Sequence, residues 1–473
     1  MWLGGPSSPV RREWKPTLSI SRTLSISRSE ISPLIRLAAP IVFTQVSMMT
    51  MGMVDIWMVS RLGTTSLAAV ALGDSWVFGT VVIAQGLIQG LDPLVTQAHG
   101  ARDPVALGRS LQRGILLALF LLPIVTLSWQ FAQDALMALG QAENLVTIAD
   151  QYVNAQIFSL PAFLGFFVLK QYLQGRGRLA PLVATVIVAN LFNVVFNELF
   201  IFGGLGIPAL GVEGAAYATG ASRWLMLLGM IFLTVRGRYL QGGWVPWSRR
   251  SFSPRAMKVL LLLGLPISVH FGVEVWTFNA TTLMAGQLGE TQIAAHIVVL
   301  KIISFTFMFP WGISGAATTR VGNLLGAADP VRARQAGIMS LLMAALVMTV
   351  LAAAILLLND RLLGFFSDDP LVLTSALALL PIAAGFQIFD GVQAVGAGVL
   401  RGAGQTIPAA AIGVIGFPCL TLPLAYHLAF RIEMGLAGIW WAFFSGLVVV
   451  AILLVSWFLV VSRHWKPLMR RIG

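Results

Sequence analysis

Apolar stretches, about twelve in number, follow one another along this chain of 473 residues and limit the folds it can adopt. A helix that crosses a bilayer needs about 20 mostly apolar residues, whereas a tilted membrane strand needs only about 10. These stretches are too long for strands, so the sequence predicts an all-α integral membrane protein with about twelve transmembrane helices. The expected spans are residues 34–60, 66–97, 105–132, 145–168, 180–202, 212–235, 256–285, 291–322, 332–358, 371–397, 407–429 and 435–461.

The composition supports a membrane protein and argues against a nucleic-acid partner. Hydrophobic residues make up 57% of the chain and charged residues 11%, with a mean hydropathy of +0.84. Soluble proteins have about half apolar and about a quarter charged residues. The net charge of +12 lies in short loops rather than on one soluble face, so DNA or RNA binding is not expected. The single cysteine, Cys419, excludes an intrachain disulfide.

The basic residues are distributed unevenly between alternate loops. Loops on one side of the expected spans carry most of the basic residues, whereas the loops on the other side hold only Arg61, Arg361 and Arg431. By the positive-inside rule both termini should face the cytoplasm. The residues counted on the cytoplasmic side include Arg36, Arg102, Lys170, Arg176, Arg250, Arg320, Arg401 and Arg471.

The second half of the chain repeats motifs of the first half. Gly100-Ala-Arg-Asp-Pro104 recurs as Gly326-Ala-Ala-Asp-Pro330, and Pro40 recurs as Pro266, a displacement of 226 positions (266 − 40). About six spans separate equivalent points, so the two halves share one orientation and the substrate path should lie between them. The predicted parts are an N-terminal six-helix lobe at 33–236, a cytoplasmic linker at 237–255, a C-terminal six-helix lobe at 256–462 and a basic cytoplasmic tail at 463–473.

Residues 1–32 break the apolar pattern because they are polar, basic and partly duplicated. Thr17-Leu-Ser-Ile-Ser-Arg22 returns as Thr23-Leu-Ser-Ile-Ser-Arg28. We expect a disordered cytoplasmic tail here. An organelle transit peptide is the alternative, since such peptides are also rich in arginine and serine.

Ionisable residues inside the expected spans are candidates for function, because burying a charge in a bilayer is costly. Asp55, Glu274 and Asp390 lie well inside spans. Asn193 and Asn197 are one helical turn apart, so they share a face, and their oxygens with Asp55 would suit Na⁺ or a protonated carboxyl group. The asparagines could equally join helices to one another.

Glu274 and Asp390 have surroundings suited to an organic cation. Phe271 and Phe278 share the face of Glu274, so charge attraction and cation-π contact could act together. A salt bridge from Glu274 to Lys301 is the structural alternative. Gln393 lies one turn after Asp390, and nearby glycines leave room for a ligand or for tight helix packing. No nucleotide-binding loop of the Gly-Lys-Ser or Gly-Lys-Thr type is present, so ATP is not indicated.

Three motifs carry a resemblance to a known family: Met53-Val-Asp55, Glu274 after Leu265-Pro266, and Asp390-Gly-Val-Gln393 before Leu400-Arg-Gly402. Over about residues 33–462 the chain resembles the multidrug and toxic compound extrusion family, NorM-type branch. The resemblance implies a V-shaped bundle of two lobes that exports amphipathic organic cations in exchange for Na⁺ or H⁺. It also implies a location in the bacterial inner (plasma) membrane. It also implies an ion site at Asp55, Asn193, Asn197 and Thr219 and a cation site at Glu274 and Asp390. Phe386 departs from the tyrosine that relatives carry.

The sequence therefore predicts a secondary active multidrug efflux antiporter. It should act as a monomer in the lipid bilayer, without enzymatic activity and with no cofactor beyond the coupling ion Na⁺ or H⁺. The expected substrate-binding residues are Glu274, Asp390, Phe271, Phe278 and Gln393, and a bend of the first helix is expected near Pro40. A flippase of lipid-linked sugars, an intramembrane hydrolase using Asp55 with Asp390, and a channel are the alternatives.

Overall fold

The structure is a computed structural model that describes residues 20–366 and 369–468. Within these residues every regular element is helical, apart from an isolated β-bridge between Gly204 and Ile207. Twelve helical segments are long and apolar enough to cross a membrane. The predicted all-α membrane fold is therefore confirmed.

The first half of the chain forms one lobe of six spans. Its second span is divided at Gly90 and its fourth at Ile157–Ser159, a short 3-10 turn. The helices of this half are α1 (Ile20–Ser60), α2 (Thr64–Gln89), α3 (Leu91–Gly100), α4 (Pro104–Gln130), α5 (Ala132–Ala138), α6 (Glu143–Gln156), α7 (Leu160–Gly175), α8 (Ala180–Ile201) and α9 (Gly211–Arg236).

The second half forms the other lobe. Its fifth span contains two π-helical segments, Ile415–Thr421 and His427–Arg431, the first of which includes Pro418. Proline has no backbone N–H to donate, so it disturbs the regular helical bonding around it. The helices of this half are α10 (Pro254–Gln287), α11 (Glu290–Gly326), α12 (Pro330–Leu357), α13 (Asn359–Gly364), α14 (Pro370–Gly402), α15 (Thr406–Val414), α16 (Leu422–Tyr426) and α17 (Gly435–Val461).

The internal repeat is visible in the backbone. Gly63 before α2 and Gly289 before α11 both have a positive φ, 107° and 115°, which glycine adopts without strain. Asp103 and Asp329 cap α4 and α12 by accepting hydrogen bonds from backbone N–H groups. Both pairs are separated by 226 positions (289 − 63, 329 − 103). The same local sequence thus builds the same turn twice.

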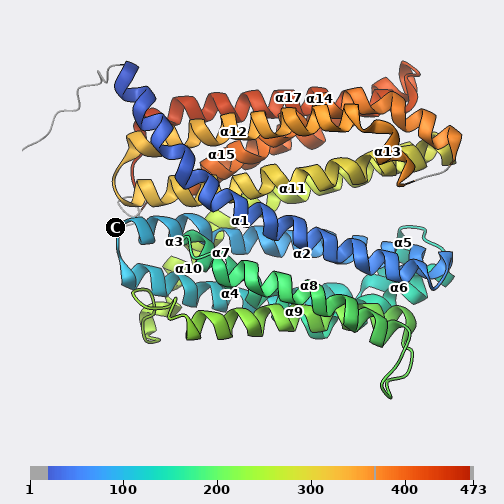
Figure 1. Cartoon of the computed structure of the whole chain (residues 1–473), viewed down its shortest axis with the longest axis horizontal. Helices are drawn as coiled ribbons and strands as arrows, with labels where there is room; N and C mark the ends of the chain where they lie inside the picture. Colours follow the sequence, from blue (N-terminus) through green and yellow to red (C-terminus); the bar gives the residue numbers. More distant parts are fainter. Residues whose placement is uncertain (1–19, 367–368, 469–473) are drawn as a thin grey trace, which may run out of the picture.

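The two lobes meet closely at one end of the bundle and diverge toward the end that carries α5 and α13 (Figure 1). We call the closed end the termini end; it contains the turns after α3 and α11 and the end of the described chain at Leu468. There α3 packs against α11, while α1 packs against α11 and α2 against α10. A two-lobed bundle that narrows at one end matches the expected V shape.

Glycines allow the close approach of the lobes at the termini end. A Cβ atom on Gly100 would lie 1.9 Å from the backbone oxygen of Asn323, and one on Gly326 would lie 2.1 Å from that of Gln97. These glycines are equivalent in the repeat, so each lobe makes the same backbone contact with the other. Small residues commonly allow such contact between membrane helices.

Polar contacts also join the lobes at the termini end. Gln97 Nε2 donates to the backbone oxygen of Gly402 at 3.0 Å, and Gln97 Oε1 accepts from the N–H of Leu468 at 2.7 Å. The buried Glu30 of α1 pairs with Arg320 at 2.7 Å and with Arg332 at 2.6 Å. The start of α1 is thereby tied to the second lobe.

The first helix extends into the segment predicted to be a disordered tail. That tail was expected through residue 32, but α1 begins at Ile20. The paired Glu30 gives a physical reason, since a buried carboxylate with two arginine partners holds this part of the helix in place. Residues 1–19, which include most of the predicted tail, and residues 469–473 of the basic tail lie outside the described residues.

The predicted linker at 237–255 packs against the first lobe between the end of α9 and the start of α10. Gln112 Nε2 donates to the backbone oxygen of Val245 at 2.7 Å, and the Tyr172 hydroxyl donates to that of Gly243 at 2.9 Å. Arg176, expected in a cytoplasmic loop, is buried and donates to the backbone oxygen of Gln241 at 2.8 Å. Its charge therefore holds the linker in position.

Candidate functional site

A cavity of about 640 Å³ lies between the two lobes. Its lining comes from α1, α2, α3 and α7 of the first lobe and from α10, α11 and α14 of the second. This is the place expected for a substrate path, and the volume is in the range of pockets that bind drug-sized molecules. Its charged lining residues are Asp92, Glu274, Asp390, Lys170, Lys301 and Arg401.

Two of the predicted carboxylates meet on the second-lobe wall of this cavity. Gln393 Nε2 donates to Glu274 Oε1 at 3.0 Å and to Asp390 Oδ1 at 3.4 Å. Both carboxylates line the cavity, and the side chain of Glu274 is 12% exposed. The structure thus brings together the predicted group of Glu274, Asp390 and Gln393, with two acids sharing one amide.

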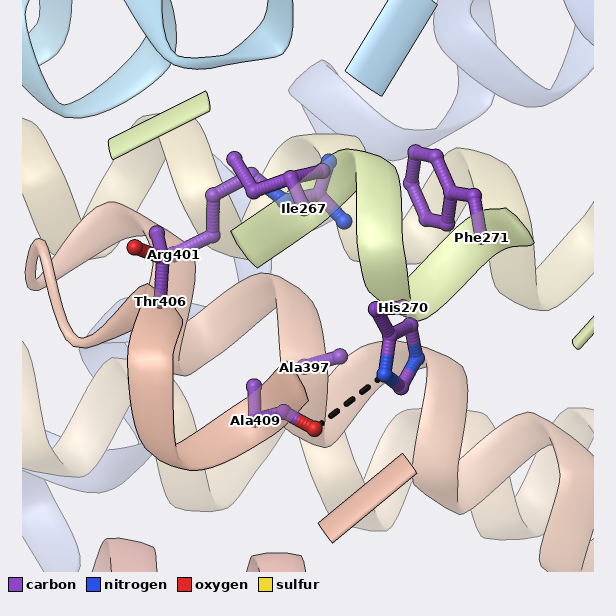
Figure 2. Close-up of a pocket in the computed structure, with 7 residues that line it drawn as sticks. All are labelled: Ile267, His270, Phe271, Ala397, Arg401, Thr406 and Ala409. Carbon is purple, nitrogen blue, oxygen red and sulfur yellow. Dashed lines mark hydrogen bonds between the residues drawn. The ribbon is translucent and has the colours of Figure 1, made fainter. Parts of the chain in front are cut away.

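The alternative partner of Glu274 is not found. Among the ion pairs of the described residues none joins Glu274 to Lys301, although both line the cavity. The basic group nearest to Glu274 in those pairs is His270, whose Nε2 lies 3.9 Å from Glu274 Oε2. The opposite ring nitrogen of His270 faces the backbone oxygen of Ala409 at 3.1 Å, as Figure 2 shows. His270 therefore connects the acid pair to α15.

Aromatic side chains lie beside the acid pair as expected. Phe271 and Phe278 both line the cavity. The ring of Phe271 lies 5.1 Å from that of Trp311, and the ring of Phe278 stacks on Phe443 at 4.6 Å. Phe386, the position that departs from the family, is fully buried and packs edge-on against Phe278. It belongs to the aromatic core behind the cavity wall.

Asp55 occupies a separate, closed site inside the first lobe. Its Oδ1 accepts from Asn193 Nδ2 at 3.0 Å and from Asn197 Nδ2 at 2.5 Å, while its Oδ2 accepts from the Thr219 hydroxyl at 2.8 Å. The two asparagines share one face of α8, Thr219 comes from α9 and Asp55 from α1. All four predicted ion-site residues are buried and in contact.

The Asp55 site has oxygen atoms suited to a small cation. The Oδ1 atom of Asn197 is buried and has no hydrogen-bond partner among the described residues. Asn190, one turn earlier on α8, donates to the backbone oxygen of Val186 instead and takes no part in the site. Carboxylate, amide and hydroxyl oxygens can ligate a hard cation, and the same amides and hydroxyl can hold Asp55 when no cation is present.

A second polar network adjoins Asp55 and was not predicted as a unit. The Tyr152 hydroxyl donates to Asp74 Oδ1 at 2.8 Å, and Arg223 donates to Gln156 Oε1 and the Ser159 hydroxyl, both at 2.9 Å. Asp74 and Arg223 lie near enough to Asp55 for their charges to interact with it. Nothing in the sequence identified the partners of Asp74 and Arg223 on the fourth span.

Two basic residues expected in cytoplasmic loops line the cavity instead. Lys170 and Arg401 are both buried, because α7 and α14 extend to Gly175 and Gly402, beyond the predicted span ends at 168 and 397. Lys170 Nζ donates to Gln45 Oε1 at 2.9 Å. Lys170 and Gln171 interrupt an otherwise apolar run, and this polar pair is the sequence feature that could have indicated a buried polar site.

Arg401 forms part of a polar contact between the two lobes in the wall of the cavity. It pairs with Asp92 of α3 at 3.6 Å and donates to Gln89 Oε1. Asp92 Oδ1 also accepts from Gln171 Nε2 at 2.8 Å. Figure 2 shows Arg401 beside the small pocket that Phe271 and His270 also line. The pair connects the two lobes through buried charges.

The first helix contains Pro33 and Pro40 and changes direction along its length in Figure 1. Proline lacks the N–H that would bond to the preceding turn, which weakens the helix locally. That the bend lies at Pro40 and moves during function stays a prediction. Asp55 and Asp390, the pair required by a hydrolase, belong to different lobes and share no hydrogen-bonding partner among the residues that the structure describes.

Comparisons with known proteins identify the family of this chain. A family model described as MatE matches residues 40–199 and 266–427, one segment in each half. The chain is 33% identical over 459 residues to the probable multidrug resistance protein NorM of Mesorhizobium japonicum, with 93% of this chain and 96% of that protein covered. It is 32% identical over 445 residues to the multidrug resistance protein PmpM of Pseudomonas aeruginosa, with 93% of each covered.

A solved structure shares the fold. The crystal structure of the eukaryotic MATE transporter AtDTX14 superposes with a TM-score of 0.87 at 25% identity, covering 94% of this chain and 99% of that one. The family match includes both cavity walls and most of the Asp55 site. The chain therefore belongs to the MatE family of multi-pass membrane transporters.

Proposed function

We propose that this protein is a secondary active multidrug efflux antiporter that exports amphipathic organic cations in exchange for Na⁺ or H⁺. The observation that carries the proposal is the separation of two buried acidic sites. Glu274 and Asp390 open into the cavity between the lobes, whereas Asp55 is enclosed within one lobe. One site is accessible to a bulky molecule and the other is suited to a small ion.

Recognition of an organic cation follows from the chemistry of the cavity wall. The two carboxylates share one amide donor, and the nearest basic group, His270, lies 3.9 Å from Glu274, so a cation in the cavity can supply the partner that the pair lacks. The faces of Phe271 and Phe278 add apolar and cation-π contact. Such a surface accepts many molecules of similar charge and hydrophobicity, in keeping with the names of the NorM and PmpM relatives.

The ion site supports either coupling ion. A proton would bind to Asp55, whose neighbours at Asn193, Asn197 and Thr219 can also accept or donate to the neutral form. A Na⁺ ion would use the carboxylate together with the free Oδ1 of Asn197. Binding of either ion changes the charge at the place where α1, α8 and α9 meet, which can shift α1 relative to the cavity that its residues Gln45 and Met48 line.

The proposed orientation places both termini in the cytoplasm of a bacterial cell, with the protein as a monomer in the inner membrane. The termini end, where the lobes are joined, then faces the cytoplasm, and the cavity is reached from outside. Opening toward the cytoplasm requires the contacts of Glu30 with Arg320 and of Asp92 with Arg401 to separate. We expect these ion pairs to break and form again in each transport cycle, as alternating access demands.

The proposal is tested with purified protein in liposomes that contain ethidium. An imposed Na⁺ gradient, pH gradient or both should drive ethidium against its own concentration gradient, and the effective gradient identifies the coupling ion. Dissipation of an ethidium gradient without uphill movement would indicate a channel. Failure to move ethidium and other organic cations under any gradient would overturn the proposal.

A flippase of lipid-linked sugars is the second candidate, and the basic groups at the cavity favour it. Lys170, Lys301 and Arg401 could attract an anionic lipid phosphate, whereas the three acidic residues would repel it. Movement of a fluorescent polyprenyl-phosphate sugar between leaflets, measured by dithionite quenching, would support this candidate. Movement equal to that in protein-free liposomes would exclude it.

A further inference from the structure

The linker between the lobes carries a dense set of basic residues at the termini end of the bundle (Figure 1). No acidic residue occurs between Glu213 and Glu274, so the local sequence supplies no charge to offset them. Among the ion pairs of residues 20–366 and 369–468 none includes a basic residue of 236–258. The exposed basic residues of this stretch are Arg236, Arg238, Arg249, Arg250, Arg255 and Lys258.

Large aromatic side chains are exposed beside these basic residues. Trp244, Trp247 and Phe252 are 48%, 43% and 58% exposed. The rings of Trp247 and Phe252 lie 5.7 Å apart, so they form one apolar surface. Rings of this size are unfavourable in water, whereas tryptophan is common at the level of the lipid headgroups. We call the six basic residues and these three aromatic residues the linker platform.

The linker platform is held in one conformation by the first lobe. The Ser251 hydroxyl donates to Gln112 Oε1 at 2.6 Å and accepts from the backbone N–H of Ser248 at 3.2 Å. Arg113 Nη2 donates to the backbone oxygen of Arg250 at 3.3 Å. Gln112 and Arg113 both belong to α4, so the exposed side chains extend from a backbone that is tied to this helix. A preorganised surface loses less conformational entropy when it binds a partner.

The combination of charge and aromatic rings favours a membrane lipid over a soluble anion. Basic groups alone would suit any phosphate, including free phosphate or a nucleic acid. The exposed rings require an apolar partner next to that phosphate. The linker platform joins the ends of two candidate membrane spans, α9 and α10, and a phospholipid offers both a phosphate and acyl chains at this depth.

We propose that the linker platform binds anionic phospholipids of the membrane leaflet at the termini end. Arg249 and Arg250 bind the lipid phosphate, because a guanidinium group presents several donors in one plane to phosphate oxygens. Trp247 and Phe252 contact the upper part of the acyl chains. A lipid bound here attaches the first lobe to the leaflet through α4, whichever ion and drug the protein carries.

Native mass spectrometry of the purified full-length protein measures the binding directly. Protein in a neutral detergent is titrated with phosphatidylglycerol, which is anionic, and in parallel with phosphatidylcholine, which is zwitterionic. Each arginine near an anionic lipid contributes about a factor of five, so Arg249→Gln combined with Arg250→Gln should weaken phosphatidylglycerol binding about 30-fold. Phosphatidylcholine binding should change by less than about twofold. Arg249→Lys combined with Arg250→Lys retains the charge and should retain the preference for the anionic lipid.

Two further double variants separate the linker platform from general effects. Arg463→Gln combined with Lys466→Gln removes two exposed charges from the second lobe at the same end, and phosphatidylglycerol affinity should stay within about twofold of wild type. Trp247→Ala combined with Phe252→Ala removes the apolar contact but no charge, so it should weaken binding of both lipids about fivefold or more. Elution profiles and thermal unfolding show that each variant is folded.

The outcomes decide between a lipid site and its alternatives. Equal losses of phosphatidylglycerol affinity in the two charge-removing variants would show an effect of net charge alone and overturn the proposal. Unchanged affinity in Arg249→Gln combined with Arg250→Gln would also overturn it. Displacement of the lipid by inorganic phosphate, together with unchanged lipid binding in Trp247→Ala combined with Phe252→Ala, would indicate a site for a soluble phosphate instead. None of these measurements uses a transported cation, so their result is independent of the proposed export.

Discussion

The two acidic sites of this protein differ in how their charge is satisfied. Asp55 receives three hydrogen bonds from Asn193, Asn197 and Thr219, all within its own lobe. Glu274 and Asp390 share one amide donor, that of Gln393, and border the cavity. The carboxylate of the first site is fully hydrogen-bonded without a ligand, whereas the two carboxylates of the second site share a single donor.

This difference shows how one fold can assign two tasks to the same kind of side chain. A carboxylate enclosed by short neutral donors leaves room only for a proton or a small ion, and its occupancy is felt by the three helices that surround it. Two carboxylates at a cavity wall instead attract a large external cation, because burying like charges together without a partner is unfavourable. The predictions below test whether the two sites are separate in function.

The largest effect is expected at Asp55. Asp55→Asn removes the charge on which ion binding depends and retains the shape of the side chain. Uphill export should therefore fall about 100-fold or more, to the level of protein-free liposomes. A factor of this size is at the upper end of the coupling that two binding sites usually show. The expression level and elution profile should match wild type. Glu198→Gln is the matched control, since Glu198 is an exposed carboxylate of the same lobe that pairs with Arg61. Uphill transport at the wild-type rate by Asp55→Asn would contradict the ion-site role.

A smaller and more selective effect is expected at the cavity. Glu274→Gln keeps the side-chain shape but loses the charge, so the affinity for cationic dyes should fall about tenfold while neutral dyes change by less than about twofold. Fluorescence titration of the purified variant measures both. Glu290→Gln, at the exposed start of α11, is the control. Equal losses for the two dye classes would mean that Glu274 shapes the cavity without recognising charge.

The sequence was sufficient to predict the fold because its strongest signals are local or repeated. Span length, the alternation of basic loops and the displacement of 226 positions from Pro40 to Pro266 do not depend on how the helices pack. The helical spacing of Asn193 and Asn197 correctly predicted a shared face. Their pairing with Asp55 was a hypothesis from the chemistry of the side chains, and Thr219 was added only by the family resemblance, because contacts between distant helices leave no periodic pattern in one chain.

The missed residues share a physical cause. Lys170 and Arg401 were assigned to loops because basic residues near span ends usually lie in water. Their helices continue past the predicted ends, where Lys170 donates to Gln45 and Arg401 contacts Asp92 and Gln89 on other helices. A single sequence does not reveal such partners, so it does not distinguish a loop charge from a buried one. Tyr152 was missed for the same reason, since its partner Asp74 is on another span.

An intermediate effect on binding tests whether the two sites communicate. Antiport requires ion and drug to weaken each other's binding, and this linkage must be reciprocal. Drug affinity of the wild-type protein should therefore decrease about fivefold when the coupling ion saturates Asp55, and Asp55→Asn should abolish this response. Titrations across about pH 5 to 9, with and without Na⁺, cover both ions. Wild-type affinity that ignores both ions, or an Asp55→Asn protein with the full response, would show that Asp55 does not couple transport.

The smallest effect is expected from removing one hydrogen bond of the closed site. Thr219→Val preserves the shape of the side chain and removes the hydroxyl that donates to Asp55 Oδ2. A single such bond contributes about 0.7 kcal/mol, so the ion concentration for half-maximal export should change by about threefold, while drug affinity without the ion should not change. Where Na⁺ is the coupling ion, the hydroxyl is also a ligand, and the required Na⁺ concentration should rise.

Asn190→Ala supplies the comparison for this variant, because Asn190 lies on the same helix as the ion-site asparagines but donates to the backbone oxygen of Val186. Its ion dependence should equal that of wild type. If Asn190→Ala and Thr219→Val shift the ion dependence equally, the effect comes from general loosening of α8 and α9 rather than from the hydrogen bond to Asp55. If Thr219→Val instead weakens drug binding without the ion, the closed site and the cavity are not separate, and the distinction drawn between Asp55 and Glu274 fails.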